Sequence, residues 1–340
     1  MNRKSFLSSV VPLAAIASSF THLKNDPDAA PSIKIPPYLK KGDVIGITCP
    51  SGHINLDEIQ PALNKMLEWG FQIRIGNTVG ATDFTFAGTD AERRDDLQLM
   101  LDSPEVKAIM LGRGGYGAVR IIDQINFSKF KLHPKWIIGF SDATVFHCHI
   151  NANFGIATLH SKMTNSFPED FLMADPTQIA SIESIRQCLS GETMNYRAPS
   201  NSNNRLGKSK GILIGGNLSI IQLLCGSISD INTDGKILFI EDVGEYLYKI
   251  DGMLWNLKRS GKLSKLKGLI VGGFRIKSDD RGEEFGRTIY ELVNEKIKEY
   301  NYPVCFDFPV GHIKENYGLQ CGVVHTLVVD EQGSSLESSR

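Results

Sequence analysis

Short apolar runs alternate with segments of helical periodicity from residue 43 onward, and this alternation constrains the fold more than any other feature. Strands are expected at 44–48, 71–75, 106–111, 136–139, 156–159, 211–214, 236–240, 269–271, 304–308 and 324–329, the last followed by a frayed polar tail. Helices are expected at about 57–69, 90–101, 118–125, 143–152, 176–190, 218–225, 247–257 and 284–300. Such alternation predicts an α/β fold whose mostly parallel, Rossmann-like sheet carries helices on both faces.

The length of the chain, 340 residues, favours two domains. The stretch 166–210 differs in character, with Phe167-Pro168 near its start and the polar run Ser200–Asn204 near its end. We therefore expect an N-terminal domain over 31–165, an inter-domain connection with one helix over 166–210, and a C-terminal domain over 211–335.

Residues 1–30 have the features of an export signal followed by a linker. Arg3 and Lys4 precede an apolar run from Phe6 to Ala17, and Ala15-Ile16-Ala17 is a small-x-small site of the kind that signal peptidase cleaves. The run is too short to span a bilayer, which needs about 20 residues. A periplasmic location without a stable membrane anchor is predicted; an amphipathic helix or an uncleaved anchor is the alternative.

Charge and cysteine content exclude several classes of partner. Lys and Arg total 37 and Asp and Glu total 38, so the net charge of −1 gives no electrostatic case for nucleic acid or anionic membrane. The six cysteines lie far apart without a C-x-x-C pair, which argues against a zinc site or a disulfide framework.

Ser141 is the sharpest local candidate for chemistry. It lies in Gly139-Phe140-Ser141-Asp142-Ala143, between an apolar strand and a predicted helix. A nucleophile elbow has this setting, because its tight turn exposes the serine oxygen above the sheet and the helix N-terminus favours developing negative charge. Capping of the helix by Ser141 or Asp142 is the alternative.

A glycine-rich loop follows another predicted strand. In Arg113-Gly114-Gly115-Tyr116-Gly117 the glycines permit a sharp turn that presents N–H groups to a bound oxygen, and Arg113 can hold a substrate carboxylate. The loop lacks the Lys-Ser/Thr of a P-loop. A tight turn with a surface arginine is the alternative.

Glu241 and His312 follow two later strands. A carboxylate at Glu241 can orient an imidazole, although helix capping by Asp242 with Glu241 in solvent is equally consistent. His312 lies in a loop suited to a general base, whereas His160 is a possible cleft residue. The order Ser141…Glu241…His312 thus places the three groups of a triad at strand ends, where α/β sheets hold ligands.

These motifs together resemble the LD-carboxypeptidase family of serine peptidases, also called muramoyltetrapeptide carboxypeptidases, over about residues 35–330. The matching segments are 37–43, Pro50-Ser51-Gly52, Ala87-Gly88-Thr89 with Arg93 and Asp96-Leu97, Arg113–Gly117, Gly139–Asp142, Gly215-Gly216-Asn217-Leu218, Glu241-Asp242 and Gly311-His312. The segment Ser161-Lys162 departs from the family, many of whose members carry Gly-Pro there, and this leaves the substrate preference open.

The resemblance implies Ser141 as nucleophile, Glu241 as orienting carboxylate and His312 as general base, without a metal or an organic cofactor. It implies a second domain with mixed strands and an active site between the domains. The backbone N–H groups of Asp142, Gly114 and Gly115 would hold the oxyanion, with Arg113 and Asn217 contacting substrate. The implied reaction removes the terminal D-alanine of a murein tetrapeptide, and the family suggests a homodimer.

Three alternatives stay open at this point. An immunity-type peptidase of the same family, which cleaves a peptidyl-nucleotide antibiotic, would need an aromatic platform for the base. A non-catalytic, exported protein that binds murein fragments would need no convergence of the three groups. A cytoplasmic location would match murein recycling in family members.

Overall fold

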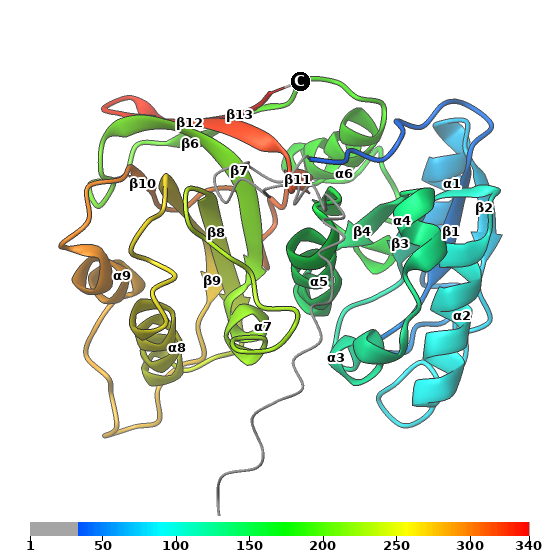
Figure 1. The fold of residues 1–340 in the computed structure, drawn as a ribbon, viewed down its shortest axis with the longest axis horizontal. Coiled ribbons are helices and arrows are strands. Elements are labelled where there is room, and N and C mark those ends of the chain that lie inside the picture. Colours follow the sequence, from blue (N-terminus) through cyan, green and yellow to red (C-terminus); the bar gives the residue numbers. More distant parts are fainter. Residues whose placement is uncertain (1–32, 340) are drawn as a thin grey trace, which may run out of the picture. The chain divides into compact units, whose positions relative to one another are not determined.

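Two β-sheets flanked by helices make up the described part of the chain, which is residues 33–339 of a computed structural model (Figure 1). The predicted export signal lies outside the described residues. No helix within residues 33–339 is long and apolar enough to cross a bilayer.

The first sheet has six strands and is mostly parallel, as predicted. Every neighbouring pair is parallel except the edge pair of β11 and β5. The strand order is β11 (Leu319–Cys321), β5 (Thr158–His160), β4 (Trp136–Gly139), β3 (Val106–Leu111), β1 (Val44–Thr48) and β2 (Gln72–Ile75). Strand β11 comes from the far end of the chain, so the first sheet is completed only when the second half has folded.

The helices of the first half follow the strands closely. They are α1 (Gln60–Glu68), α2 (Asp90–Asp102), α3 (Ala118–Ile121), α4 (Ser128–Leu132) and α5 (Thr144–Phe154). Helix α2 begins at a complete capping box, in which Thr89 and Glu92 exchange hydrogen bonds. The helix expected over 118–125 is shorter, because it tightens after one turn into a 3-10 turn at Ile122–Gln124.

The second sheet has seven strands and is mixed. Strands β10, β9, β8 and β7 are parallel, and β12, β13 and β6 continue the sheet in antiparallel fashion. The order is β10 (Val304–Cys305), β9 (Gly268–Arg275), β8 (Ile237–Val243), β7 (Gly207–Asn217), β12 (Val324–Asp330), β13 (Gly333–Ser338) and β6 (Asn195–Pro199).

The helices of the second half of the chain are α6 (Pro176–Leu189), α7 (Leu218–Leu223), α8 (Leu247–Arg259) and α9 (Ile289–Ile297). The helix expected over 284–300 begins later, because the capping box of Thr288 and Glu291 sets its first turn. Gly261 lies just past α8 with φ +80°, the conformation that terminates many helices.

Two segments that the sequence predicts to be irregular form strands in the structure. The expected polar tail forms β13, and the expected connection over 166–210 contains β6 and the first residues of β7. In β6 only Tyr196 and Ala198 are buried, in strict alternation with exposed residues. A strand whose outer face is polar has little apolar signal, which is why the sequence pattern did not reveal it.

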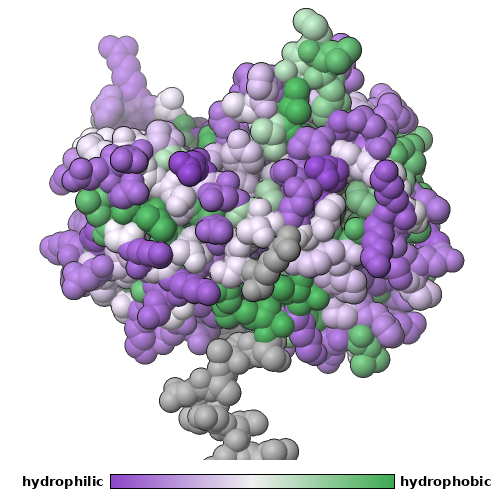
Figure 2. All heavy atoms as spheres, turned by 90° about the horizontal axis from the view of Figure 1, so that it is seen from above, coloured by the Kyte–Doolittle hydropathy of each residue, from purple (hydrophilic) through white to green (hydrophobic). Residues whose placement is uncertain are grey.

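Side chains from both sheets share one core. Phe146 and Ile150 of α5 belong to the same buried cluster as Ile214 of β7 and Leu218 of α7. Helix α5 therefore packs between the sheets, as Figure 1 shows. On the face seen in Figure 2, hydrophilic residues dominate and apolar residues gather in separate patches.

Buried histidines make the stability depend on pH, because burial lowers the pKa of His147, His149, His160 and His325. Burial lowers the pKa of His147 and of His325 to about 4, although a backbone carbonyl hydrogen bond opposes the shift in each. Below about pH 6.5 the unfolded chain protonates both imidazoles while the folded chain does not, so the free energy of unfolding falls as the pH drops from about 6.5 to 4. The effect is on the order of 3 kcal/mol per histidine.

Urea denaturation at pH 7 and pH 5 measures this loss. The His325→Gln variant is expected to flatten the dependence, whereas His133→Gln, which changes an exposed histidine, is not. An equal loss of unfolding free energy between pH 7 and pH 5 in the wild type and both variants would contradict the expectation.

Candidate active site

Ser141 occupies a strained turn between β4 and α5. Its φ is +63°, a left-handed conformation that costs a non-glycine residue roughly 1–2 kcal/mol. A single 3-10 turn, Ser141–Ala143, leads directly into α5, and the side chain of Ser141 stays partly exposed. A Cβ on Gly139 would lie 3.0 Å from the Cβ of Ala143, so this turn has room only for small residues. These are the features of a nucleophile elbow.

The alternative of helix capping is wrong. Helix α5 begins after Ala143 without a side-chain cap. Asp142, which is 1% exposed, turns its carboxylate away from α5 toward the glycine-rich loop. Its Oδ2 accepts hydrogen bonds from Ser51 Oγ at 2.5 Å and from the backbone N–H of Ala118 at 2.8 Å.

The glycine-rich loop lies against the serine. A Cβ on Gly114 would be 3.2 Å from Ser141 Oγ and 3.1 Å from its Cβ, so glycine lets this backbone approach the hydroxyl closely. Gly115 has a φ of +108°. The carbonyl of Gly114 accepts a hydrogen bond from Gly52 N–H at 3.0 Å, which ties the loop to the segment that follows β1.

The peptide unit between Gly117 and Ala118, at the end of this loop, is hydrogen-bonded through both its carbonyl and its N–H. Arg93, fully buried on α2, donates a hydrogen bond to the carbonyl of Gly117 at 3.1 Å, while the next N–H, of Ala118, goes to Asp142. Arg93 also donates to the carbonyls of Pro50 and Gly88. Asp142, the residue after Ser141, thereby fixes the glycine-rich loop that lies against Ser141. The exposed Arg113, by contrast, donates only to the His53 carbonyl, at 3.3 Å.

Glu241 is fully buried near the end of β8, so the alternative that leaves it in solvent is wrong. The pairing of β8 with β9 is irregular here, because Ile240 pairs with Val271 and Asp242 pairs with Phe274. Such bulges redirect side chains near functional sites. Burial raises the pKa of Glu241 and nearby Asp242 adds to the rise, while His312 opposes it.

His312 contacts Glu241 directly. Its Nδ1 lies 2.5 Å from Glu241 Oε2, and the backbone that carries it passes so close that a Cβ on Gly311 would be 2.5 Å from the Cβ of Glu241. Asn316 fixes the same loop by accepting the N–H of Gly311 at 2.9 Å. A carboxylate on Nδ1 leaves Nε2 as the nitrogen that can exchange a proton with a substrate or a nucleophile.

Phe140 connects Ser141 to His312. The ring of Phe140, the residue before the serine, packs on the imidazole with centroids 4.8 Å apart. Among residues 33–339 no hydrogen bond joins Ser141 to His312, so the structure brings together the carboxylate and the imidazole and leaves the serine beside them. Hydrogen bonds of this kind are commonly long in unliganded enzymes and tighten with substrate.

Asn217 and Asp242 lie next to Glu241 and hold α7. Asn217 pairs with Glu241 in the sheet, accepts the N–H of Ile220 at 3.2 Å and donates to Asp242 at 3.1 Å. Asp242 also accepts the N–H and the hydroxyl of Ser219. His160, a predicted cleft residue, is instead fully buried, with its ring against Phe239.

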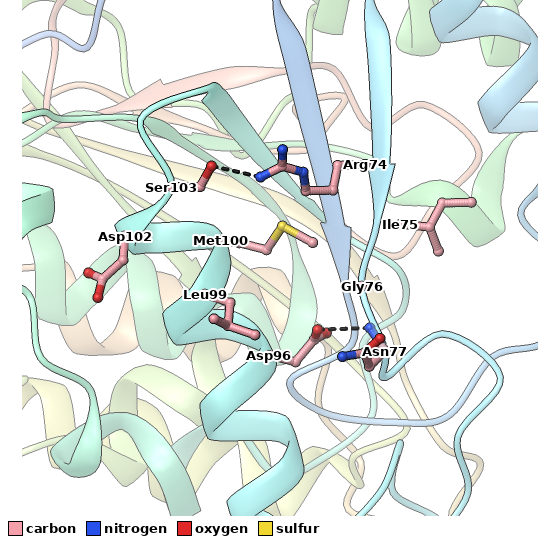
Figure 3. Close-up of a pocket in the computed structure, with 9 residues that line it drawn as sticks. All are labelled: Arg74, Ile75, Gly76, Asn77, Asp96, Leu99, Met100, Asp102 and Ser103. Carbon is pink, nitrogen blue, oxygen red and sulfur yellow. Dashed lines mark hydrogen bonds between the residues drawn. The ribbon is translucent and has the colours of Figure 1, made fainter.

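A separate cavity of about 450 Å³ lies between β2 and α2 (Figure 3). Asp96, one of the two aspartates that line it, is already occupied, because it accepts hydrogen bonds from Thr48 Oγ1, Thr78 Oγ1 and Asn77 N–H. Asp96 thus ties together the ends of β1 and β2, and none of the candidate catalytic groups lines this cavity. Within residues 33–339 no cluster of three His, Cys, Asp or Glu is arranged to hold a metal ion.

Replacing Gly311 by alanine is expected to separate Glu241 from His312. Gly311 has a φ of +108°, and an added Cβ would lie 2.8 Å from Glu241 Oε2. We expect kcat to fall at least about tenfold, since misplacement of catalytic groups by about 1 Å costs up to about a hundredfold. Gly226→Ala is the matched control, because its φ is +81° and its Cβ would meet nothing within 4 Å. Equal kcat in the two variants would contradict the expectation.

A serine on an elbow, a buried carboxylate–imidazole pair and a tight glycine loop at the carboxyl ends of strands are features of the hydrolase class. The LD-carboxypeptidase N-terminal domain model matches residues 45–161, and the LD-carboxypeptidase C-terminal domain model matches residues 210–327. The chain belongs to the LD-carboxypeptidase family, and the protein is a hydrolase of the carboxypeptidase type.

Several relatives cover most of the chain. A probable murein peptide carboxypeptidase of Bacillus subtilis is 31% identical over 305 residues, 89% of this chain and 94% of the relative. The murein tetrapeptide carboxypeptidase of Pseudomonas aeruginosa is 27% identical, over 80% and 89%. The microcin C7 self-immunity protein MccF of Escherichia coli is 27% identical, over 78% and 84%.

Solved structures show the same fold. The crystal structure of muramoyltetrapeptide carboxypeptidase from Oxalobacter formigenes matches with a TM-score of 0.77 and 25% identity, and the match covers 87% of this chain and 99% of that one.

Proposed function

We propose that the protein is a serine carboxypeptidase that hydrolyses the LD-peptide bond before the C-terminal D-alanine of murein tetrapeptides. The observation that carries the proposal is the contact of buried Glu241 with the partly exposed His312, beside Ser141 on its strained turn. The relatives named for murein peptides support this substrate class.

The proposed reaction is acyl transfer through a covalent intermediate. His312 takes the proton of the Ser141 hydroxyl while Glu241, on the other ring nitrogen, stabilises the imidazolium. The serine oxygen attacks the carbonyl carbon of the residue before D-alanine, and a tetrahedral oxyanion forms. Its collapse breaks the peptide bond, and the leaving amine takes the proton from His312. Water, deprotonated by His312, then attacks the acyl carbon; the ester bond to Ser141 breaks, and His312 returns the proton to the Ser141 oxygen.

The oxyanion is assigned to the backbone around Ser141. The N–H groups of Asp142 and of the Gly114-Gly115 turn are the proposed donors, each worth roughly 3–4 kcal/mol. The proximity of Gly114 to the hydroxyl supports this assignment. The hydrogen bonds of Arg93 and Asp142 to the peptide unit at the end of the loop keep the donors in place. We assign Arg113 to a carboxylate in the acyl part of the peptide. Asn217 is proposed to act beside Glu241, at the edge of the substrate site.

The immunity-type peptidase is the second candidate, and the similarity to MccF favours it. A nucleotide base would need an aromatic platform. Trp69 and Trp136 are buried in the first half of the chain, and Trp255 lies on α8 against Lys258 and Lys296. Among residues 33–339 no tryptophan contact is described for Ser141, Glu241 or His312, so a platform would have to come from another aromatic residue, such as the exposed Tyr116 of the glycine-rich loop.

A non-catalytic murein-binding protein is the candidate of another class. Binding alone would not require a buried carboxylate in contact with a loop imidazole, because burying the carboxylate costs desolvation free energy. Their contact at 2.5 Å therefore supports the enzyme.

Mass spectrometry of purified protein incubated with a panel of stem peptides tests the proposal. The expected result is loss of one D-alanine from the tetrapeptide and no cleavage of a peptidyl-nucleotide conjugate. The opposite selectivity would overturn the substrate assignment, and intact peptides throughout would favour the binding protein. A periplasmic location remains part of the proposal, and full-length protein in the cytosolic fraction would contradict it.

A further inference from the structure

Lys162 brings a positive charge to the neighbours of both proposed catalytic side chains. It follows β5, and its Nζ donates a hydrogen bond at 2.9 Å to the carbonyl of Ile313, the residue after His312. The same ammonium lies 5.9 Å from the ring centroid of Phe140, the residue before Ser141. These two contacts place the charge beside the candidate active site, on the side of His312.

The ammonium of Lys162 has no carboxylate partner at ion-pair distance among residues 33–339. The side chain is half-buried, and burial lowers its pKa, while Glu315 opposes the shift from a greater distance. Lys314, on the loop of His312, shows the usual arrangement, since it is exposed and pairs with Asp175 at 2.5 Å. Charges that are partly removed from solvent are normally paired with an opposite charge. The ammonium of Lys162 can therefore bind an anion that comes from outside the chain.

The chemistry of acyl transfer indicates which anion reaches this position. His312 must return its proton to the leaving amine, so the leaving residue has to lie on the side of the imidazole. In a C-terminal amino acid the carboxylate is bonded to the same carbon as that amine. The terminal carboxylate therefore also lies near His312, whereas the glycine-rich loop lies against Ser141, where the carbonyl oxygen is proposed to bind.

We propose that Lys162 binds the terminal carboxylate of the leaving amino acid and thereby makes the enzyme specific for peptides with a free C-terminus. This inference rests on the proposed function. It also gives a role to Ser161-Lys162, the segment at which the sequence departs from the family pattern.

The test compares two substrates in each of four proteins: the wild type, Lys162→Met, Lys162→Arg and Lys314→Met. The substrates are a murein tetrapeptide with a free C-terminal carboxylate and the same peptide as its C-terminal amide. In the Lys162→Met variant, kcat/KM for the acid is expected to fall about tenfold to hundredfold, the effect of a hydrogen bond to a charged group. The fall for the amide should be at least about tenfold smaller, since the amide carries no charge to bind. Lys162→Arg should restore part of the loss.

Lys314→Met is the matched control, because it removes a cation from the loop of His312 and leaves Lys162 in place. A wild-type protein that releases no D-alanine would refute the proposed function. An active wild type whose Lys162→Met variant loses acid and amide equally would instead refute the role of Lys162. Inhibition of the wild type provides a readout without a variant: D-alanine should inhibit better than D-alaninamide, and equal inhibition would also refute the inference.

Discussion

Replacement of Ser141 by alanine is expected to abolish release of D-alanine from a murein tetrapeptide, with kcat reduced by about 10⁴-fold to 10⁶-fold. Alanine removes the oxygen that would form the acyl intermediate and leaves the backbone at φ +63° as strained as before. The fold should not change, because within residues 33–339 the hydroxyl makes no hydrogen bond to another element. The measurement is D-alanine release under single-turnover conditions, together with a thermal melt.

Ser128→Ala controls for the loss of a hydroxyl, since Ser128 is exposed at the start of α4. A covalent readout adds to the assay: trapping with an active-site acylating reagent should add its mass to the wild type and to Ser128→Ala, and not to Ser141→Ala. Turnover by Ser141→Ala near the wild-type rate would eliminate the nucleophilic mechanism.

Replacement of Glu241 by glutamine is expected to lower kcat by about 10³-fold to 10⁴-fold. The amide has nearly the same shape, but it has no negative charge to stabilise an imidazolium, and its NH₂ group favours the wrong tautomer of His312. The stability should stay equal or increase, because burial raises the pKa of Glu241 and so opposes its charged form. A fall in kcat without a fall in melting temperature is therefore the signature of this variant.

Asp242→Asn should behave in the opposite way. This neighbouring carboxylate accepts two hydrogen bonds from Ser219 at the start of α7, so its replacement should cost about 1–2 kcal/mol of stability and leave most of the activity. If Glu241→Gln keeps the wild-type kcat, or if the two variants lose activity equally, the orienting role of Glu241 is wrong.

Much of the fold could be predicted because its signals are local. Strand β3 begins and ends where the apolar run does, and α2 starts at the capping box read from Thr89 and Glu92. Strands β6 and β13 were missed because few of their residues are apolar, even though β13 forms a tight hairpin with the predicted strand β12. The alternatives at Ser141 and Glu241 also stayed open, since a cap and a catalytic group have the same residue type at the same turn.

By itself the sequence determined which segments become buried strands, where the turns between strand and helix fall, and which side chains with useful chemistry occupy them. Periodicity and turn residues act over a few positions, so they can be read in one dimension. Tertiary packing alone decided that Glu241 meets His312 across 71 residues, that Asp142 serves the glycine-rich loop instead of its own helix, and that Lys162 lies beside His312. Contacts of this kind depend on how the two sheets pack around α5, and long-range packing leaves no periodic trace in the chain.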